Sequence, residues 1–244
     1  MAPSTARARA DAMAVDAGNA ALAPRYERKF RVDETSRAVV LRAIAEHPAL
    51  FREIFHERYV NSIYFDTPDL RLYFANVDGD AERDKVRLRW YGEMLGSIRA
   101  PTLERKRKFG LVGSKDSVRV GDFALHAGIH GAALVRALDH DAVPPPLRST
   151  CRALRPLLLV RYRRRYFLSS CGRFRVTVDD DLQFVRLEEG VNALARRARD
   201  PAVIIELKYA AEDDRAAAAV AKAMPFRLTR NSKYVVGVDS LFHV

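Results

Sequence analysis

The sequence predicts an α+β fold in which an antiparallel β-barrel is covered on its outside by helices. Many segments read as strands and few as helices, and the regular alternation of strand and helix that builds a parallel sheet is missing. Charged and apolar residues alternate along several of these segments, so each has one charged and one apolar face. With 244 residues, 48% of them hydrophobic, the chain can bury a large core.

Strands are predicted from alternation and from β-branched and aromatic residues. The predicted strands cover residues 26–32, 59–65, 85–90, 102–108, 157–169, 173–187 and 202–209. Cys171 and Gly172 separate the fifth strand from the sixth and predict a hairpin turn. Thr67-Pro68-Asp69 predicts a further turn, and the three prolines at 144–146 predict a break.

Helices are predicted at four places. Asp33 is a good N-cap for a helix that ends before Pro48. Residues 128–140 and the alanine-rich residues 212–223 have helical patterns, and Thr229 is predicted to cap a last helix. The apolar positions of the first and last helices are Val40, Leu41, Ile44, Tyr234, Val235, Val238, Leu241 and Phe242.

The bulk composition limits the class of protein. A formal net charge of +11 is typical of proteins with a polyanionic partner, such as nucleic acid, anionic lipid or phosphate-rich small molecules. Residues 1–23 lack a continuous apolar stretch and are interpreted as a disordered tail, with one domain over residues 24–244. No apolar run reaches membrane-spanning length, and two cysteines without a metal-binding spacing suggest reduced thiols in the cytoplasm.

The charged faces of the predicted strands carry the functional argument. Charged or polar residues share a face in five sets: Glu27 and Lys29; Lys85, Arg87 and Arg89; Glu104, Lys106 and Lys108; Arg173, Arg175, Thr177 and Asp179; Glu206 and Lys208. In a single strand this pattern most simply means a solvated outer face. Repeated over five strands, several with an acid two residues before a cation, it favours a charged barrel interior.

Lysine is rare in this chain, so its positions are informative. Only 8 of the 42 basic residues are lysines: positions 29, 85, 106, 108, 115, 208, 222 and 233. A compact ammonium group suits a single phosphate oxygen, whereas arginine forks across two. We therefore interpret the lysines as chosen for phosphate chemistry, with Lys222 of the alanine-rich helix as the ordinary exception.

These segments resemble the VTC domains. The motifs occur in the same order: Tyr26-Glu-Arg-Lys-Phe30, Ser62-Ile-Tyr-Phe-Asp-Thr67, Lys85-Val-Arg-Leu-Arg89 with Tyr91, Leu103-Glu-Arg-Lys-Arg-Lys108, Tyr162-Arg-Arg-Arg165, Arg175-Val-Thr-Val-Asp179, Glu206-Leu-Lys-Tyr209 and Ser232-Lys-Tyr234. VTC domains are polyphosphate polymerase domains among the triphosphate tunnel metalloenzymes, whose other members include the CYTH phosphatases and the class IV adenylate cyclases. The resemblance spans roughly residues 24–243, nearly the whole predicted domain.

The resemblance implies an eight-stranded antiparallel tunnel that binds ATP, triphosphate or polyphosphate lengthwise with Mn²⁺ or Mg²⁺. It assigns catalytic phosphate contacts to Arg87, Arg89, Lys106 and Lys233. It assigns further phosphate contacts to Lys29, Lys85, Lys108, Arg164, Arg175, Lys208 and Ser232. Glu206 is the implied metal ligand, with help from Glu27 or Glu104. Alternation alone would equally allow Arg161, Arg163 and Arg165 to face the tunnel in place of Arg164.

One departure from the family pattern bears on the reaction. The CYTH phosphatases open with an acid-x-acid-x-Lys pattern, whereas this chain has Arg25 before Glu27-x-Lys29. One metal-binding acid is thus missing, which favours a polyphosphate polymerase that transfers the γ-phosphate of ATP to a growing chain. The alternatives are a metal-dependent triphosphatase and a non-catalytic module that binds polyphosphate or inositol polyphosphates. A membrane protein that receives the product is a further expected partner.

Other residue types add little to the functional argument. No helix-turn-helix or aromatic RNA-binding motif is present, so nucleic acid is not an expected partner, and Trp90 is predicted to lie in the core. The six histidines fall mostly at loops or helix ends and are predicted to be surface residues. A phosphate acceptor is already ionised and needs no general base.

Overall fold

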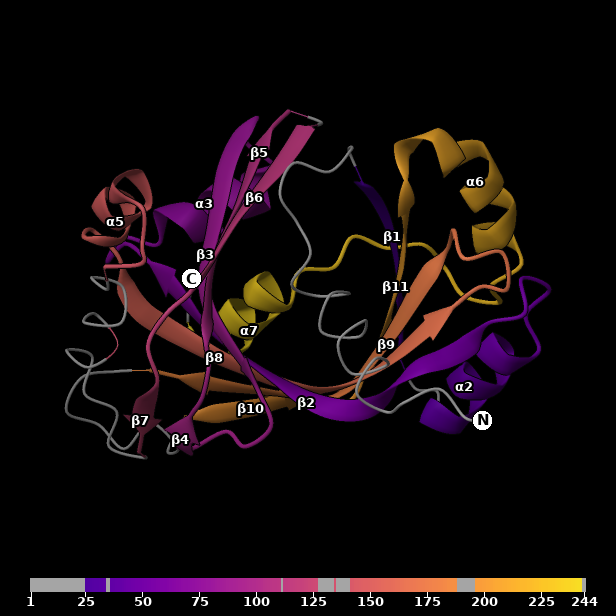
Figure 1. Ribbon diagram of the computed structural model, residues 1–244, viewed down its shortest axis with the longest axis horizontal. Coiled ribbons are helices and arrows are strands. Elements are labelled where there is room, and N and C mark those ends of the chain that lie inside the picture. Colours follow the sequence, from indigo (N-terminus) through magenta and orange to yellow (C-terminus); the bar gives the residue numbers. More distant parts are fainter. Residues whose placement is uncertain are drawn as a thin grey trace, which may run out of the picture. The chain divides into compact units, whose positions relative to one another are not determined.

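The computed structural model describes residues 25–33, 36–110, 112–126, 134, 141–187 and 196–242 (Figure 1). Apart from Leu134, the predicted helix at 128–140 lies outside the described residues, and so does the predicted tail at 1–23. None of the helices in the described ranges is long and apolar enough to cross a membrane.

One large antiparallel sheet dominates the fold. Its strands are β1 (Arg25–Val32), β2 (Arg52–Asp66), β3 (Glu82–Tyr91), β5 (Thr102–Phe109), β6 (Val112–Arg119), β8 (Arg155–Leu168), β9 (Arg175–Arg186), β10 (Arg197–Asp200) and β11 (Val203–Ala210). Eight of them follow the order β1-β11-β9-β8-β2-β3-β5-β6, and β10 pairs with β9. In the described part of the chain this path starts at β1 and ends at β6, with no pairing between these two that would close it into a barrel. A separate hairpin pairs β4 (Gly96–Ile98) with β7 (Phe123–Leu125).

Five α-helices and one 3₁₀ turn complete the described elements. They are α2 (Arg37–Ala45), α3 (Arg71–Asp78), α5 (Pro145–Cys151), the 3₁₀ turn η2 (Ala211–Asp213), α6 (Asp214–Lys222) and α7 (Lys233–Leu241). The predicted α+β class with an antiparallel sheet is confirmed. The chain forms two compact units, and strands β2, β8 and β9 contribute residues to both.

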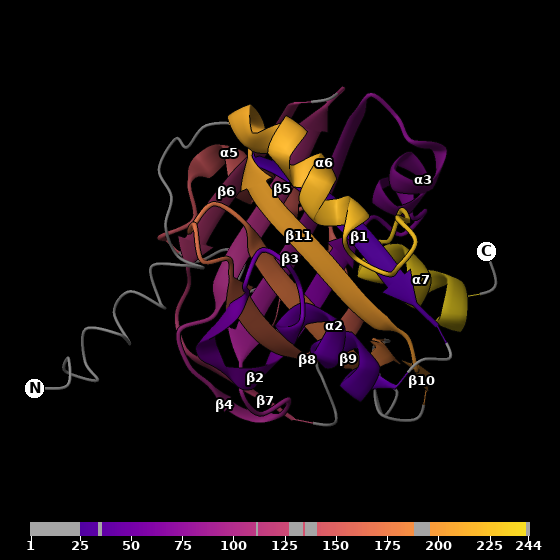
Figure 2. The same ribbon diagram turned by 90° about the vertical axis from the view of Figure 1, so that its right-hand side faces the viewer.

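The first unit comprises Met1–Glu57, Arg165–Val178 and Val203–Thr229. Here β1 and β11 are paired over their whole length, and α6 lies along β11 (Figure 2). The core residues contributed by β1, β11, α2 and α6 include Phe30, Val32, Ile205, Leu207, Val40, Ile44, Ala217 and Ala221. The two helices therefore cover the apolar face of the β1–β11 pair and leave its other face to the charged residues.

The second unit comprises Arg58–Arg164, Asp179–Ala202 and Arg230–Val244. Its core joins β2, β3, β5, β8 and β9 to α5 and to the β4–β7 hairpin. Trp90 is only 2% exposed within this core, as predicted, and its indole N–H donates to the carbonyl of Glu93. Helix α7 packs closely on the sheet at Gly237, where an added Cβ would lie 2.6 Å from the side chains of Leu158 and Phe184.

Several sequence predictions about element boundaries were wrong. The first helix is capped by Ser36, whose hydroxyl accepts from Val39 N, while the predicted cap Asp33 instead pairs with Arg31. The last helix is capped by Ser232, and the predicted cap Thr229 donates its backbone N–H to the carbonyl of Lys29. Residue type alone did not decide either cap, because the Asp33 carboxylate is taken by the nearby Arg31 and Thr229 is bound through its backbone to β1.

Further elements were missed or misread. The prolines at 144–146 do not simply break the chain: Pro144 is the N-cap of α5, and proline tolerates the first helical turn. Helix α3 was not predicted.

His47 is 3% exposed, not a surface residue as predicted. Its Nδ1 accepts from Ala49 N and its Nε2 therefore donates to the carbonyl of Val220, so it serves as a satisfied core residue.

Candidate phosphate-binding site

The first unit holds a checkerboard of charges on the β1–β11 pair. Glu27 lies opposite Lys208 and Lys29 opposite Glu206 in the antiparallel register. Lys29 Nζ lies 2.8 Å from Glu27 Oε1 and 3.7 Å from Glu206 Oε1, and Lys208 Nζ lies 2.9 Å from Glu206 Oε2. The Glu-x-Lys pattern occurs in both β1 and β11, and it is visible in the sequence alone.

This checkerboard also shows which acids suit a divalent cation. Glu27 and Glu206 share the Lys29 ammonium, so the space between their carboxylates already accommodates a positive charge. Thr177 Oγ1 lies 3.5 Å from Glu206 Oε2. It is another oxygen atom, the type of ligand that hard cations prefer. The donor set therefore fits Mn²⁺ or Mg²⁺ at Glu27 and Glu206. The described residues contain no cluster of three or more His, Cys, Asp or Glu that could hold a metal on its own.

The second unit carries a stripe of cations across β3, β5 and β6. The stripe has four rows set by the strand register: Arg83 with Lys108; Lys85, Lys106 and Lys115; Arg87 with Glu104; and Arg89 with Arg119 across Thr102. Like charges directly opposite one another are destabilising, and in the second row Lys115 is neutralised by Glu104 while Lys85 donates to the Ser232 hydroxyl. Lys106 and Lys115 of the second row are exposed, whereas Arg89 and Glu104 are 8% and 5% exposed.

Glu104 neutralises part of this stripe. Its Oε2 lies 2.6 Å from Arg87 and 3.8 Å from Arg89, and its Oε1 lies 2.6 Å from Lys115 Nζ. Burial raises the pKa of Glu104, but the fields of Arg87, Arg89 and Lys115 outweigh this and hold the pKa well below its usual value. A carboxylate already shared by three cations is a poor metal ligand, so the structure favours Glu27 over Glu104 as the partner of Glu206.

The lowered pKa of Glu104 makes a testable stability prediction. The unfolded state takes up a proton near the ordinary glutamate pKa, but the folded state does so only at much lower pH. The stability difference between wild type and Glu104→Gln should thus be constant from pH 7 to about pH 4.5 and shrink as the pH falls further. Urea unfolding at each pH measures it. The matched control is Glu46→Gln on the exposed end of α2, which should change little at any pH. A difference that persists undiminished at pH 3 would contradict the assignment.

A second buried carboxylate lies under the stripe. Asp179 is 0% exposed and accepts both Arg164 N–H groups, at 2.6 and 2.7 Å, and Lys233 Nζ at 2.6 Å. Lys233 Nζ lies 4.8 Å and the Arg164 guanidinium lies 5.1 Å from the centroid of the Tyr162 ring. Its hydroxyl lies 3.5 Å from Arg89, which links the Asp179 group to the Glu104 group. In these contacts five cations share two carboxylates, so the net charge is positive.

The neighbouring arginines of β8 face the other way. Arg161 donates to Asn61 Oδ1, Arg163 to Asp180, and Arg165 to Glu53. Of the four candidates, Arg164 is thus the one joined to the cation cluster of the second unit. That this face lines a tunnel stays a prediction.

Tyr64 adds a phenol to the same cluster. Its hydroxyl accepts from Arg87 at 3.1 Å. Burial raises the pKa of Tyr64, but Arg87, Arg89 and Lys233 lower it by more, so the pKa lies below the ordinary value. The positive field responsible for this shift is the field that a bound phosphate would meet.

The N-terminus of α7 points into the cations. Lys85 Nζ donates to the hydroxyl of Ser232 at 2.9 Å, and Lys233 is the first residue of the helix. No acid lies in the first helical turn, although the partial positive charge of a helix N-terminus favours one. Asp179, paired with Lys233 at 2.6 Å, is the negative charge near this helix N-terminus.

The structure thus gathers the predicted residues into two clusters, one in each unit. The first-unit cluster contains Glu27, Lys29, Glu206 and Lys208, and Arg175 belongs to the same unit on β9. The second-unit cluster contains Lys85, Arg87, Arg89, Glu104, Lys106, Lys108, Arg164, Ser232 and Lys233. That both clusters contact one phosphate chain stays a prediction. No role in the site was predicted for Asp179, Tyr64 or Tyr162, although each stands in one of the VTC-like motifs, because the cations that they contact are known only from the structure.

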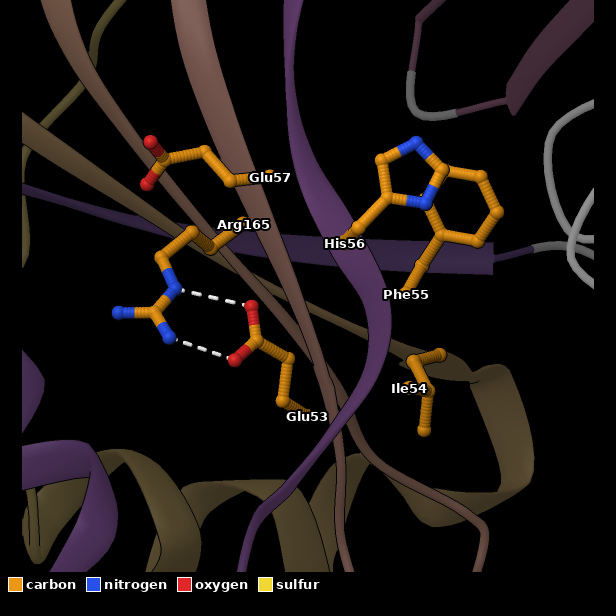
Figure 3. A pocket seen from close by; sticks show the side chains of 6 residues that line it. All are labelled: Glu53, Ile54, Phe55, His56, Glu57 and Arg165. Carbon is orange, nitrogen blue, oxygen red and sulfur yellow. Dashed lines mark hydrogen bonds and ion pairs between the residues drawn. The ribbon is translucent and has the colours of Figure 1, made fainter.

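A surface hollow on β2 and β8 of the first unit is not this site. It is lined by Glu53, Ile54, Phe55, His56, Glu57 and Arg165. The Arg165 guanidinium makes two contacts with Glu53, at 2.9 and 2.5 Å (Figure 3), and Glu57 pairs with Arg37. Its acids are thus already neutralised by arginine, and none of the predicted site residues lines it.

Known proteins match this chain at the level of family and fold. The model of the VTC domain matches residues 24–242. A proposed adenylyl cyclase from Hippeastrum, described as having a dominant triphosphatase activity, has a TM-score of 0.53 at 15% identity, over 88% of this chain and 96% of its own. A proposed adenylate cyclase from Vibrio parahaemolyticus (14% identity, 88% and 98% covered, TM-score 0.49) and the protein PH1819 from Pyrococcus horikoshii (13%, 88% and 96%, 0.47) are more distant in shape. No curated protein matches the sequence.

Proposed function

The chain belongs to the VTC domain family, and we propose that it is a polyphosphate polymerase that transfers the γ-phosphate of ATP to a growing polyphosphate chain. The observation that carries this proposal is the length of the cation stripe in the second unit. From Arg83 to Arg89 the strand advances six residues, about 20 Å. A linear triphosphate covers only part of such a stripe, whereas a longer phosphate chain can contact every row.

The residues of the cation clusters suit phosphoryl transfer between two phosphates. The reaction needs the attacking and leaving oxygens in line and charge neutralised along the chain, and it requires no covalent intermediate on the protein. Arginine and lysine fixed by Glu104 and Asp179 are held in place before substrate arrives, so little reorganisation is needed during the reaction. The acceptor phosphate is ionised at neutral pH, which removes the need for a basic side chain.

We further propose that the first unit binds a divalent cation. Glu206 and Glu27 would hold Mn²⁺ or Mg²⁺, which when bound supplies Lewis-acid polarisation of phosphoryl oxygens. Lys29 and Lys208 flank the same carboxylates and can move to phosphate oxygens when the metal replaces their charge.

The direct test is to incubate the protein with ATP and Mn²⁺ or Mg²⁺ and to follow both products. Growth of polyphosphate with release of ADP supports the proposal. Release of inorganic phosphate without chain growth would replace it with a triphosphatase, an activity described for the Hippeastrum protein of similar fold. Tight binding of polyphosphate without turnover would indicate a non-catalytic binding module.

Arg89 should distinguish the site from the general excess of positive charge. Its side chain is buried beside Ser62, Tyr162 and Glu104. Arg89→Ala removes one charge-assisted phosphate contact worth roughly 1.5–3 kcal/mol, so calorimetry should show triphosphate affinity falling about 10- to 100-fold. The control Arg199→Ala changes an exposed arginine of β10 and should leave the affinity unchanged. Equal small losses at both positions would mean that arginine acts here only through net charge.

A further inference from the structure

Asp66, the last residue of β2, contacts both α3 and α7 in the second unit. It is 1% exposed, and its two oxygens accept five hydrogen bonds, one of them from the Thr67 hydroxyl to Oδ1 at 3.3 Å. Oδ1 accepts from the backbone N–H groups of Thr67 at 2.7 Å and Leu72 at 2.9 Å. Oδ2 accepts from Tyr73 N at 2.9 Å and from the hydroxyl of Tyr234. The carboxylate thus satisfies the first turn of α3, whose N-cap residue Leu70 provides no side-chain acceptor.

Tyr234 connects this carboxylate to the cation cluster. It follows Lys233 directly in the first turn of α7, and its ring stacks on Tyr64 with centroids 4.9 Å apart and planes at 18°. Burial and Asp66 raise the pKa of Tyr234, so the hydroxyl stays protonated and remains the donor. Tyr234 is therefore held at its hydroxyl by Asp66 and on its ring face by Tyr64, whose own hydroxyl accepts from Arg87.

These contacts fix the position and the rotation of the first turn of α7. Lys233 Nζ reaches Asp179 and Ser232 accepts from Lys85 only if the helix starts at this position and rotation. Two cations and a helix N-terminus meet there, and their mutual repulsion would tend to displace the turn. The bond from Tyr234 to Asp66 opposes that displacement.

We propose that Asp66 and Tyr234 are positioning residues that hold the first turn of α7 so that Lys233 and Ser232 contact the phosphate chain. The inference rests on the proposed function, because it assigns the phosphate contacts to this turn. Neither residue touches the phosphate, and both act through Lys233.

The chain offers a matched control for the key substitution. Tyr73 of α3 also ties α3 to α7, since its hydroxyl donates to Asp239 Oδ1 at 2.6 Å. Tyr73→Phe and Tyr234→Phe each remove one phenol hydroxyl that donates to a carboxylate beside α7, from Tyr73 to Asp239 of α7 and from Tyr234 of α7 to Asp66 at the end of β2. Only Tyr234 adjoins Lys233, so a purely structural role predicts similar effects of the two variants, whereas a positioning role does not.

The experiment is a double-mutant cycle on triphosphate affinity, measured by calorimetry, with melting temperature followed alongside. Tyr234→Phe should weaken binding about 3- to 10-fold, because one hydrogen bond that fixes Lys233 is lost. Tyr73→Phe should lower the melting temperature about as much as Tyr234→Phe does, and it should leave the triphosphate affinity unchanged. In a Lys233→Ala background, Tyr234→Phe should have no further effect on affinity.

Three results would overturn the inference: no loss of affinity in Tyr234→Phe, an equal loss in Tyr73→Phe, or an undiminished loss in the Lys233→Ala background. If Tyr234→Phe is unfolded at the assay temperature, Asp66→Asn tests the same contact from its other end. Failure of the proposed function is distinguishable, because it would appear in the turnover assay as an absence of polyphosphate growth from ATP, whereas the inference is judged on triphosphate affinity alone.

Discussion

Replacement of Asp179 by asparagine should destabilise the protein by about 3–5 kcal/mol, because it leaves a buried arginine and a buried lysine without their common counter-charge. Asp179 is fully buried, and Arg164 and Lys233 are 4% and 8% exposed. Water cannot replace the lost carboxylate for either cation. Unfolding in urea at neutral pH measures the loss directly.

Added triphosphate should recover part of this loss. An anion that binds only the folded state raises its stability, and the site of Asp179→Asn is more positive than that of the wild type. The rise in melting temperature with triphosphate should therefore be larger for the variant.

Asp116→Asn is the control for the Asp179 substitution, because Asp116 forms a half-exposed pair with Arg107 at 3.2 Å. Such a pair contributes about 0–1 kcal/mol. If Asp179→Asn costs no more than Asp116→Asn, or if triphosphate stabilises the variant less than the wild type, Asp179 does not neutralise a phosphate site.

Glu206→Gln should lower metal-dependent turnover at least about 100-fold. Substitution of a residue that only hydrogen-bonds to a metal ligand already lowers metal affinity or activity about 10- to 100-fold. The substitution keeps the shape of the side chain and removes the charge shared by Lys29 and Lys208. Triphosphate binding without metal should be unchanged or tighter, because a negative charge near the phosphates is gone. Turnover is measured against metal concentration, and binding by calorimetry in the presence of a chelator.

The exposed Glu212, in the 3₁₀ turn of the same unit, provides the comparison for Glu206. Glu212→Gln should leave both turnover and binding unchanged. Wild-type turnover in Glu206→Gln would transfer the role of metal ligand to Glu27, the other carboxylate beside Lys29.

Local patterns in the sequence were sufficient for the strands and their faces. Alternation in 85–90 and 102–108 predicted strands that extend only slightly further, as β3 and β5. The side chains of Lys85, Arg87 and Arg89 must share a face because the strand period is two, whatever the rest of the fold does. The VTC motifs then identified the family, because the motifs and their order along the chain are visible in the sequence alone.

Tertiary structure decided how the charges are paired. Glu104 was a plausible metal ligand from its position in a strand, but the register brings Lys115 of β6 and Arg87 of β3 onto its two oxygens. Which residues of neighbouring strands lie beside Glu104 depends on the register between the strands, which alternation within a single strand does not give. The same reason explains why Asp179, a residue of β9, was not recognised as the acceptor of Arg164 and Lys233.

The sequence by itself therefore determined the antiparallel α+β class, the family and the set of cations that share strand faces. Only the tertiary structure decided which carboxylates hold those cations, and that Ser232 rather than Thr229 begins α7. The physical reason is one of range: side-chain alternation and motif order are properties of neighbouring residues. An ion pair or a helix cap instead depends on which competing partner, far away in the chain, the packed core brings within hydrogen-bonding distance.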